Sequence, residues 1–254
     1  MLKRGQVSAF LIIGILILII VILLFSFKDS ILEKISSQGK QPLNVEKQLE
    51  SKMSSISDKI TKCTNEEVTN VIKLISDQGG YLEMNNYKTY HGRKVTVLCS
   101  KYDKNQNCFN QVPVISLVEE NLNNYLQQKI VDCVKILDFE TSDINLKYEK
   151  PEVEVKINKM NIVINLYYPI TVIKDKQQFG EDKFVINVDS SFGKFLEIAN
   201  IIVGDISTGG YFNVAEFSNT DPGWIVDPRV MSDYTVYRIT DYYEKNEFWL
   251  SVEK

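Results

Sequence analysis

An uncharged apolar run at residues 7–27 constrains this chain more than any other feature. It reads VSAFLIIGILILIIVILLFSF, and as a helix rising about 1.5 Å per residue it would cover the roughly 30 Å hydrocarbon core of a bilayer. A soluble core helix of this length is rarely apolar on every face, and a cleaved secretory signal has a shorter apolar run followed by a small-x-small site. We therefore predict a transmembrane helix at residues 6–27, with the lipid bilayer as a partner.

The charges on either side of this run predict its orientation. Lys3 and Arg4 precede it, whereas Lys28 after it is followed at once by Asp29. Because positive charge next to a span is retained in the cytoplasm, we expect a cytoplasmic N-terminus and an extracellular C-terminal part. The predicted segments are a basic leader at residues 1–5, the transmembrane helix at 6–27, a stalk at 28–43 and an extracellular α+β domain at 44–254.

The composition of the outer part is that of a globular domain without a nucleic-acid footprint. The chain has 44% hydrophobic residues, enough to bury a core. Its net charge is −4, and this becomes −6 once Lys3 and Arg4, the only charged residues before residue 28, are set aside. Acidic and basic residues are interleaved, so we expect no nucleic-acid partner.

The first half of the outer part has helical periodicity. Thr64 with Glu67 three positions later matches a capping box and predicts the start of a second helix, which ends at Gly79 and Gly80, although the two helices could also form one bent helix. Ser116 with Glu119 predicts the start of another helix in the same way. The first apolar stripe consists of Val45, Leu49, Met53, Ile56, Ile60 and Cys63.

The second half changes to a period of two. Residues 152–157 and 162–166 alternate around a polar turn and predict an antiparallel hairpin, with a further strand at 184–188. A helix capped by Asp189 or Ser190 is expected next, before a terminal hairpin made of residues 234–239 and 247–252. The predicted fold class is α+β, with helices first and an antiparallel sheet after them.

All four cysteines lie on the predicted outer side, where disulfides persist. Three connectivities are possible, and spacing alone does not choose among them. Cys99 and Cys108 flank a polar turn, whereas Cys63 and Cys133 lie on apolar helix stripes, so we favour the pairs 99–108 and 63–133. A four-cysteine zinc site lacks the required Cys-x2–4-Cys spacing.

No catalytic motif is evident, and we expect no catalytic residue, metal site or cofactor. The single histidine, His91, lies in a turn-like stretch, and phosphate loops, Gly-x-Ser-x-Gly and His-Glu-x-x-His motifs are missing from the sequence. Aromatic residues near polar turns suit contact with carbohydrate or protein, although tyrosines in sheets also pack in cores. The predicted binding surface consists of Trp224, Trp249, Tyr242 and Tyr243.

The residues before the apolar run carry a more specific signal. Residues 3–8, KRGQVS, resemble the class III signal peptide of archaeal type IV pilin-like proteins, with Gln6 and Ser8 at the matching positions. This resemblance implies that a prepilin-type peptidase cleaves between Gly5 and Gln6 and leaves the apolar helix attached. Phe10 stands where pilins commonly have Glu, which puts filament assembly in doubt.

The outer part loosely resembles uncharacterised archaeal envelope proteins. The resemblance lies in residues 78–81 (QGGY), in Pro113 ahead of a helix with Cys133, and in residues 168–170 (YPI), and it implies no activity. We expect a non-enzymatic cell-surface protein that serves adhesion or envelope or pilus-like assembly, with other envelope proteins or like subunits as partners. The alternative is a membrane-tethered extracellular enzyme, hydrolytic activity included.

Overall fold

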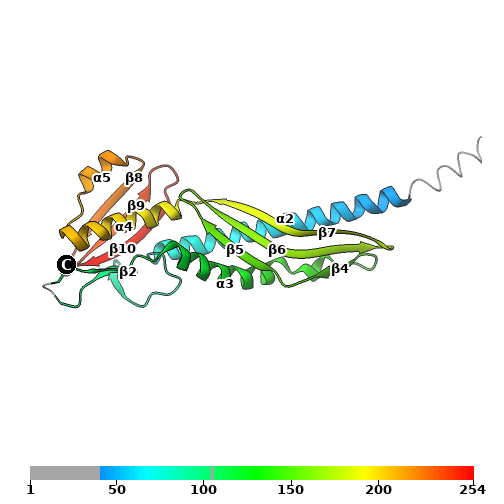
Figure 1. Ribbon diagram of the computed structural model, residues 1–254, viewed down its shortest axis with the longest axis horizontal. Coiled ribbons are helices and arrows are strands. Elements are labelled where there is room, and N and C mark those ends of the chain that lie inside the picture. Colours follow the sequence, from blue (N-terminus) through cyan, green and yellow to red (C-terminus); the bar gives the residue numbers. More distant parts are fainter. Residues whose placement is uncertain (1–40, 104–105) are drawn as a thin grey trace, which may run out of the picture.

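The computed structural model describes residues 41–103 and 106–254. These residues form an elongated α+β molecule with two sheets, one toward each end (Figure 1). The leader and the predicted transmembrane helix at residues 6–27 lie outside the described residues. No helix within the described ranges is long and apolar enough to cross a bilayer.

One long helix, α2 (Gln41–Asp77), replaces the two predicted helices. The capping-box interpretation of Thr64 and Glu67 is wrong, because the apolar stripe continues through Thr64 without a break and the chain remains helical. The helix ends where the sequence predicts: Gly79 and Gly80 have φ values of 68° and 94°, which glycine adopts readily.

The first sheet lies beside α2 and has β6 as its central strand. β7 pairs along one edge of β6, and β5 and β4 pair with successive halves of the other edge. The predicted hairpin and third strand are therefore confirmed, within longer strands. The strands are β4 (Asn145–Tyr148), β5 (Glu152–Ile157), β6 (Asn161–Lys174) and β7 (Gln177–Asp189).

The helix α3 (Ile115–Val134) packs against β5 and α2, and is followed by a short 3-10 helix, η1 (Ile136–Phe139). Its predicted capping box is absent, since the residue before it, Val114, makes no side-chain cap. Glu119 instead accepts a hydrogen bond from the backbone N–H of Ile157 at 2.8 Å. This contact covers a backbone donor of β5 that would otherwise be unpaired.

The second sheet unites strands from both ends of the described chain. β10 pairs with β9 in the predicted terminal hairpin and also runs parallel to β2. Since β1, β2 and β3 precede α3 along the chain, the predicted order of all helices before the sheet is wrong. The strands are β1 (Tyr87–Tyr90), β2 (Arg93–Ser100), β3 (Phe109–Asn110), β8 (Trp224–Val230), β9 (Tyr234–Asp241) and β10 (Glu247–Glu253).

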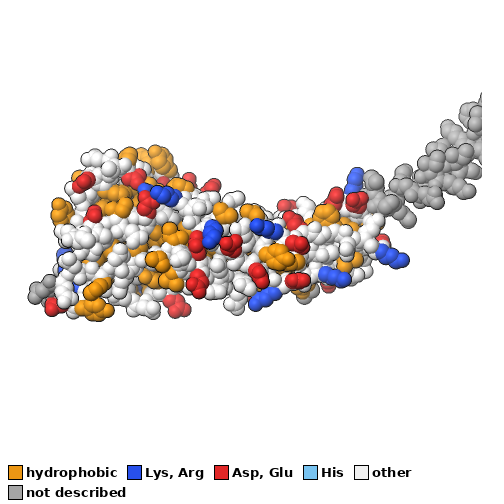
Figure 2. Space-filling model, viewed as in Figure 1, with side chains coloured by type: hydrophobic (Ala, Val, Ile, Leu, Met, Phe, Trp, Pro, Cys, Tyr) orange, Lys and Arg blue, Asp and Glu red, His pale blue; other side chains and the backbone are white. Residues whose placement is uncertain are grey.

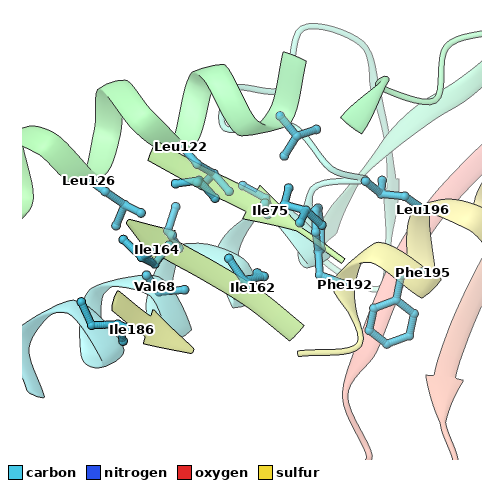
Figure 3. Packing of buried hydrophobic residues seen from close by; sticks show 14 of the residues in the cluster. Val68, Ile75, Leu122, Leu126, Ile162, Ile164, Ile186, Phe192, Phe195 and Leu196 are labelled. Carbon is cyan, nitrogen blue, oxygen red and sulfur yellow. The ribbon is translucent and has the colours of Figure 1, made fainter. Parts of the chain in front are cut away.

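The helices α4 (Phe192–Gly209) and α5 (Val214–Thr220) lie over the second sheet, and α4 begins directly beyond β7. Phe195 of α4 stacks on Phe248 of β10 at 5.8 Å between ring centroids. One continuous apolar core runs through both halves of the molecule (Figure 3), where Val68 of α2, Leu122 of α3 and Ile164 of β6 meet. The two sheets therefore share a core and do not form separate domains.

Candidate functional site

A cleft of about 390 Å³ opens where the two sheets meet. It lies between the C-terminal part of α2, the junction of β7 with α4, and the turn between β9 and β10. Its apolar lining comes from Ile72, Val188, Phe192 and Phe195. The charged residues that line it are Lys73, Asp77, Arg93, Asp189, Lys245 and Glu247.

Three of these charged residues, Arg93, Asp77 and Glu247, are engaged by the protein itself. Arg93 donates a hydrogen bond to Asp77 Oδ1 at 2.5 Å and lies 4.6 Å from the centroid of the Trp249 ring, a cation–π contact. Glu247 accepts hydrogen bonds from Arg238 at 3.3 Å and from the indole N–H of Trp249 at 3.1 Å. These contacts attach the end of α2 to the second sheet.

Other charges of the cleft are available to a partner. Lys73 and Asp189 form no ion pair with any described residue. Lys245 lies 4.3 Å from the centroid of the Tyr242 ring and has φ of 60°, at the tight turn between β9 and β10. The cleft therefore offers groups of both signs above an apolar floor, which suits the binding of a polar partner segment.

A buried polar pair lies beneath the cleft. The hydroxyl of Ser191 donates a hydrogen bond to Asp241 Oδ2, and both residues are 2% exposed. Burial opposes the ionisation of Asp241, but hydrogen bonds from Ser191 and from the amides of Tyr243 and Glu244 together hold its pKa below the ordinary value. The serine is thus bound to an ionised carboxylate and has no neighbouring histidine in the cleft lining, so the pair supports the turn and is not arranged as a nucleophile and its base.

Two residues of the predicted aromatic surface are built into the fold. Trp224 is 8% exposed and meets Phe195 edge-on at 5.3 Å, so it belongs to the core and not to a surface. Trp249 is partly buried on β10, with Arg93 and Arg238 at 4.6 and 5.8 Å from its ring centroid. The interpretation of Trp224 as a surface contact is therefore corrected, whereas Trp249 keeps part of its ring accessible.

Tyr242 and Tyr243 are accessible, with 53% and 79% exposure, and their rings meet edge-on at 5.4 Å. They lie on the turn that also lines the cleft through Lys245 and Asn246. The accessible part of the predicted aromatic surface is thus this turn, at the rim of the cleft. The charged part of the cleft was missed by sequence reasoning, because its residues come from segments far apart in the chain.

Two disulfides stabilise the described chain. Cys63 of α2 is bonded to Cys133 of α3, and Cys99 of β2 is bonded to Cys108 just before β3. These are the pairs that the sequence analysis favours. Neither pair lines the cleft, and within the described ranges no group of metal-ligating side chains is assembled. Gly5 and Gln6, the predicted cleavage residues, lie outside the described residues.

No protein-family model, no curated protein and no solved structure matches this chain. His91, which any histidine-dependent mechanism would require, lies in the turn between β1 and β2 and meets the ring of Tyr90 edge-on at 4.4 Å. Glu181, whose pKa burial raises, belongs to the middle of β7 and not to the cleft lining. The histidine and this carboxyl are thus both outside the cleft.

Proposed function

We propose that this chain is a single-pass, membrane-anchored surface protein, pilin-like at its N-terminus, that presents an extracellular α+β domain for adhesion or envelope assembly. The observation that carries the proposal is the uncharged run at residues 7–27 with Lys3 and Arg4 before it, followed by a domain with two disulfides. Disulfides persist outside the reducing cytosol, and the flanking charges favour the same side for the domain.

The shape of the described molecule suits such a role. The start of α2 lies at one end, and the second sheet with α4 and α5 lies at the other (Figure 1). The 37 residues of α2 extend about 55 Å at 1.5 Å per residue. An anchor preceding α2 would therefore leave the second sheet, with its cleft and exposed tyrosines, well away from the membrane surface.

The surface supports contact with a protein or glycan more than with a highly charged polymer. On the face shown in Figure 2, acidic and basic side chains are interspersed along the body, and hydrophobic side chains gather near the end that carries α4 and α5. Tyr242 and Tyr243 add an exposed aromatic pair on the turn whose Lys245 and Asn246 line the cleft. Aromatic residues next to accessible charges are typical of protein contact surfaces.

A membrane-impermeant amine reagent applied to intact cells tests the topology. Lys183 is exposed on β7 and should be modified as completely in intact cells as in lysed cells, while the lysines of a cytoplasmic protein remain unmodified until lysis. Mass spectrometry of the peptide that contains Lys183 measures the extent of modification. Modification of Lys183 only after lysis would reverse the orientation and exclude a surface function.

A further inference from the structure

A second cavity, of about 430 Å³, is lined in part by the last residue of the chain, Lys254. The C-terminus lies at the end of the molecule opposite the start of α2 (Figure 1). The cavity opens between the C-terminal end of α4 and strands β8, β9 and β10. Ile206, Phe212 and Val252 supply an apolar wall, while Lys101 and Glu253 lie at its charged side. We call it the distal cavity. Its volume lies in the range of small-ligand sites, which are mostly apolar with a few convergent polar groups.

Two hydroxyl groups in the distal cavity have no partner in the described protein. Thr235 and Tyr237 both line it, and they are 8% and 7% exposed. Because Thr235 and Tyr237 are two residues apart on β9, their side chains point to the same face of the sheet, and their Cα atoms are about 7 Å apart. Neither side-chain oxygen makes a hydrogen bond with a described residue.

These hydroxyls are open to the cavity and not sealed in the core. Among the described residues, the buried oxygens that are both sealed from solvent and unpaired are those of Thr64 and Gln177. The oxygens of Thr235 and Tyr237 are unpaired but are not sealed in this way. Buried polar groups normally have partners, so two unpaired hydroxyls directed into one cavity indicate that a ligand or water completes their hydrogen bonds.

The hydroxyls have aromatic neighbours on one side of the cavity, while Lys101, Glu253 and Lys254 supply its charged lining. The ring of Phe212 meets Tyr237 edge-on at 6.2 Å, and Tyr211 is 72% exposed beside the cavity. Burial raises the pKa of Tyr237, so its phenol is protonated and able to donate a hydrogen bond at neutral pH. A ligand here meets neutral hydrogen-bonding groups on one side and aromatic faces on the other.

The carboxylate at the charged side is already occupied. Glu253 accepts a hydrogen bond from the backbone N–H of Lys101 at 2.9 Å, and it forms an ion pair with Lys88 at 3.0 Å. The ammonium group of Lys254 is also engaged, since it donates a hydrogen bond to the carbonyl oxygen of Met231. A neutral ligand can therefore satisfy the interior hydroxyls without displacing an ion pair of the lining.

We propose that the distal cavity binds a neutral pyranose sugar unit. Sugar hydroxyls both donate and accept hydrogen bonds, as the hydroxyls of Thr235 and Tyr237 require, and the C–H faces of a pyranose ring pack against aromatic rings such as those of Phe212 and Tyr211. Sugar binding would give the adhesion function proposed above a ligand, and its role at the cell surface rests on that function. Sugar binding by the purified chain is measured independently of cleavage and topology.

The test uses the full-length chain in a detergent without a sugar head group. Titration calorimetry with methyl glycosides of glucose, galactose and mannose should show saturable binding of at least one of them. Tyr237→Phe and Thr235→Val each remove one hydroxyl with little change of shape, and each should weaken binding about fivefold or more, as expected for one lost hydrogen bond. The double variant should show no measurable binding.

Tyr234→Phe is the matched control, since Tyr234 is on the same strand but donates its hydroxyl to the carbonyl of Thr89. It should bind as tightly as the unaltered chain. If methyl glycosides and free hexoses bind equally, the cavity accepts a substituent at the anomeric oxygen, and its ligand is the terminal unit of a glycan. If only free hexoses bind, the ligand is a soluble sugar. Absence of binding for every sugar, or equal affinity in the folded double variant, would overturn the proposal.

Discussion

The hydroxyl of Ser191 donates a hydrogen bond to Asp241 Oδ2, across a separation of 50 residues. Ser191 immediately precedes α4, and Asp241 ends β9. The other oxygen of Asp241 accepts hydrogen bonds from the amides of Tyr243 and Glu244 at 2.9 and 3.2 Å. A single buried carboxylate therefore fixes both the start of α4 and the turn that carries the exposed tyrosines.

Asp241 should make folding stability depend on pH in the acid range. Its folded pKa is lowered, so its stabilising contribution is present above the ordinary carboxyl pKa of about 3.9 and is lost as the pH falls through the folded value. We expect Asp241→Asn to destabilise the chain by about 1.5–3 kcal/mol at pH 7 and to flatten the stability profile below about pH 4. Thermal unfolding measured by circular dichroism between pH 2 and 7 provides the test.

Glu181→Gln is the matched control for this carboxylate, because burial raises the pKa of Glu181 and does not lower it. A raised pKa means that ionisation disfavours the folded state, so stability is fully present below the unfolded pKa and declines as the pH rises through the folded value. Glu181→Gln should therefore become relatively more stable toward neutral pH, opposite to Asp241→Asn. Parallel profiles for the two variants would contradict our account.

Gly193, in the first turn of α4, should not tolerate a side chain. An added Cβ would lie 2.2 Å from the carbonyl oxygen of Asn158 and 2.8 Å from its carbon, both backbone atoms of the turn between β5 and β6. We expect Gly193→Ala to destabilise the chain by about 1–3 kcal/mol, because the junction of the two sheets must move apart. Chemical denaturation of the full-length chain measures this cost.

Gly204 in the same helix provides the control, since an added Cβ there meets nothing within 4 Å. Gly204→Ala should stabilise the chain by about 0.5–1 kcal/mol through helix propensity alone. Equal effects of the two substitutions would show that the close approach at Gly193 has no energetic role.

The local elements of this fold could be predicted from the sequence, because their patterns are local. The alternation in residues 152–157 and the glycines after α2 mark β5 and a helix end correctly. β8 could not be predicted, since Pro228 and charged residues interrupt its alternation and its pairing with β9 alone makes it a strand. The parallel pairing of β2 with β10 joins strands about 150 residues apart, and no local period records such a contact.

The candidate site was predictable only in part. Tyr242 and Tyr243 follow a strand in a polar turn, and that context indicates exposure correctly. Trp224 has a similar polar context, but its ring turns toward Phe195 because β8 places it on the face that α4 covers. Which face of a strand is buried depends on the helix packed against it, and this information is tertiary.

Removing the hydroxyl of Thr64 should raise the stability of the folded chain. Thr64 lies in the middle of α2 with 0% exposure, and its oxygen has no hydrogen-bond partner among the described residues. Thr64→Val keeps the shape and removes the unpaired hydroxyl, so we expect stabilisation by about 1 kcal/mol or more. Thr69→Val, at an exposed position of the same helix, should change stability by less than about 0.5 kcal/mol. A loss of stability in Thr64→Val would indicate that a bound water completes the hydroxyl.

The N-terminus of the mature chain tests the signal-peptide resemblance. The residues Arg4-Gly5-Gln6 motivate cleavage after Gly5, so terminal sequencing of protein purified from its own membrane should begin at Gln6. Replacing Gly5 with a bulky residue, as in Gly5→Leu, should block cleavage and leave the longer chain. If the natural protein instead begins at Met1 or Leu2, the pilin-like interpretation is wrong.

The last prediction concerns the unequal contributions of the two disulfides. The bond between Cys63 and Cys133 closes a loop with a sequence separation of 70 residues, whereas that between Cys99 and Cys108 spans 9. Chain-entropy estimates give about 4 kcal/mol for the longer loop and about 2.5 kcal/mol for the shorter. The bond between Cys63 and Cys133 also links α2 to α3. Without this bond, the two segments can move far apart in the unfolded chain, which raises the entropy of that state.

We therefore expect Cys63→Ala with Cys133→Ala to lower the melting temperature more than Cys99→Ala with Cys108→Ala. Alanine is chosen over serine because Cys63 and Cys99 are 1% and 0% exposed, and a serine hydroxyl would add a burial cost unrelated to the bond. Calorimetry of both double variants, beside the oxidised parent and the fully reduced parent, separates bond loss from the loss of side-chain packing. If the two double variants melt together, or if non-reducing peptide mapping links Cys63 to Cys99, the long loop does not have the stabilising role we assign to it.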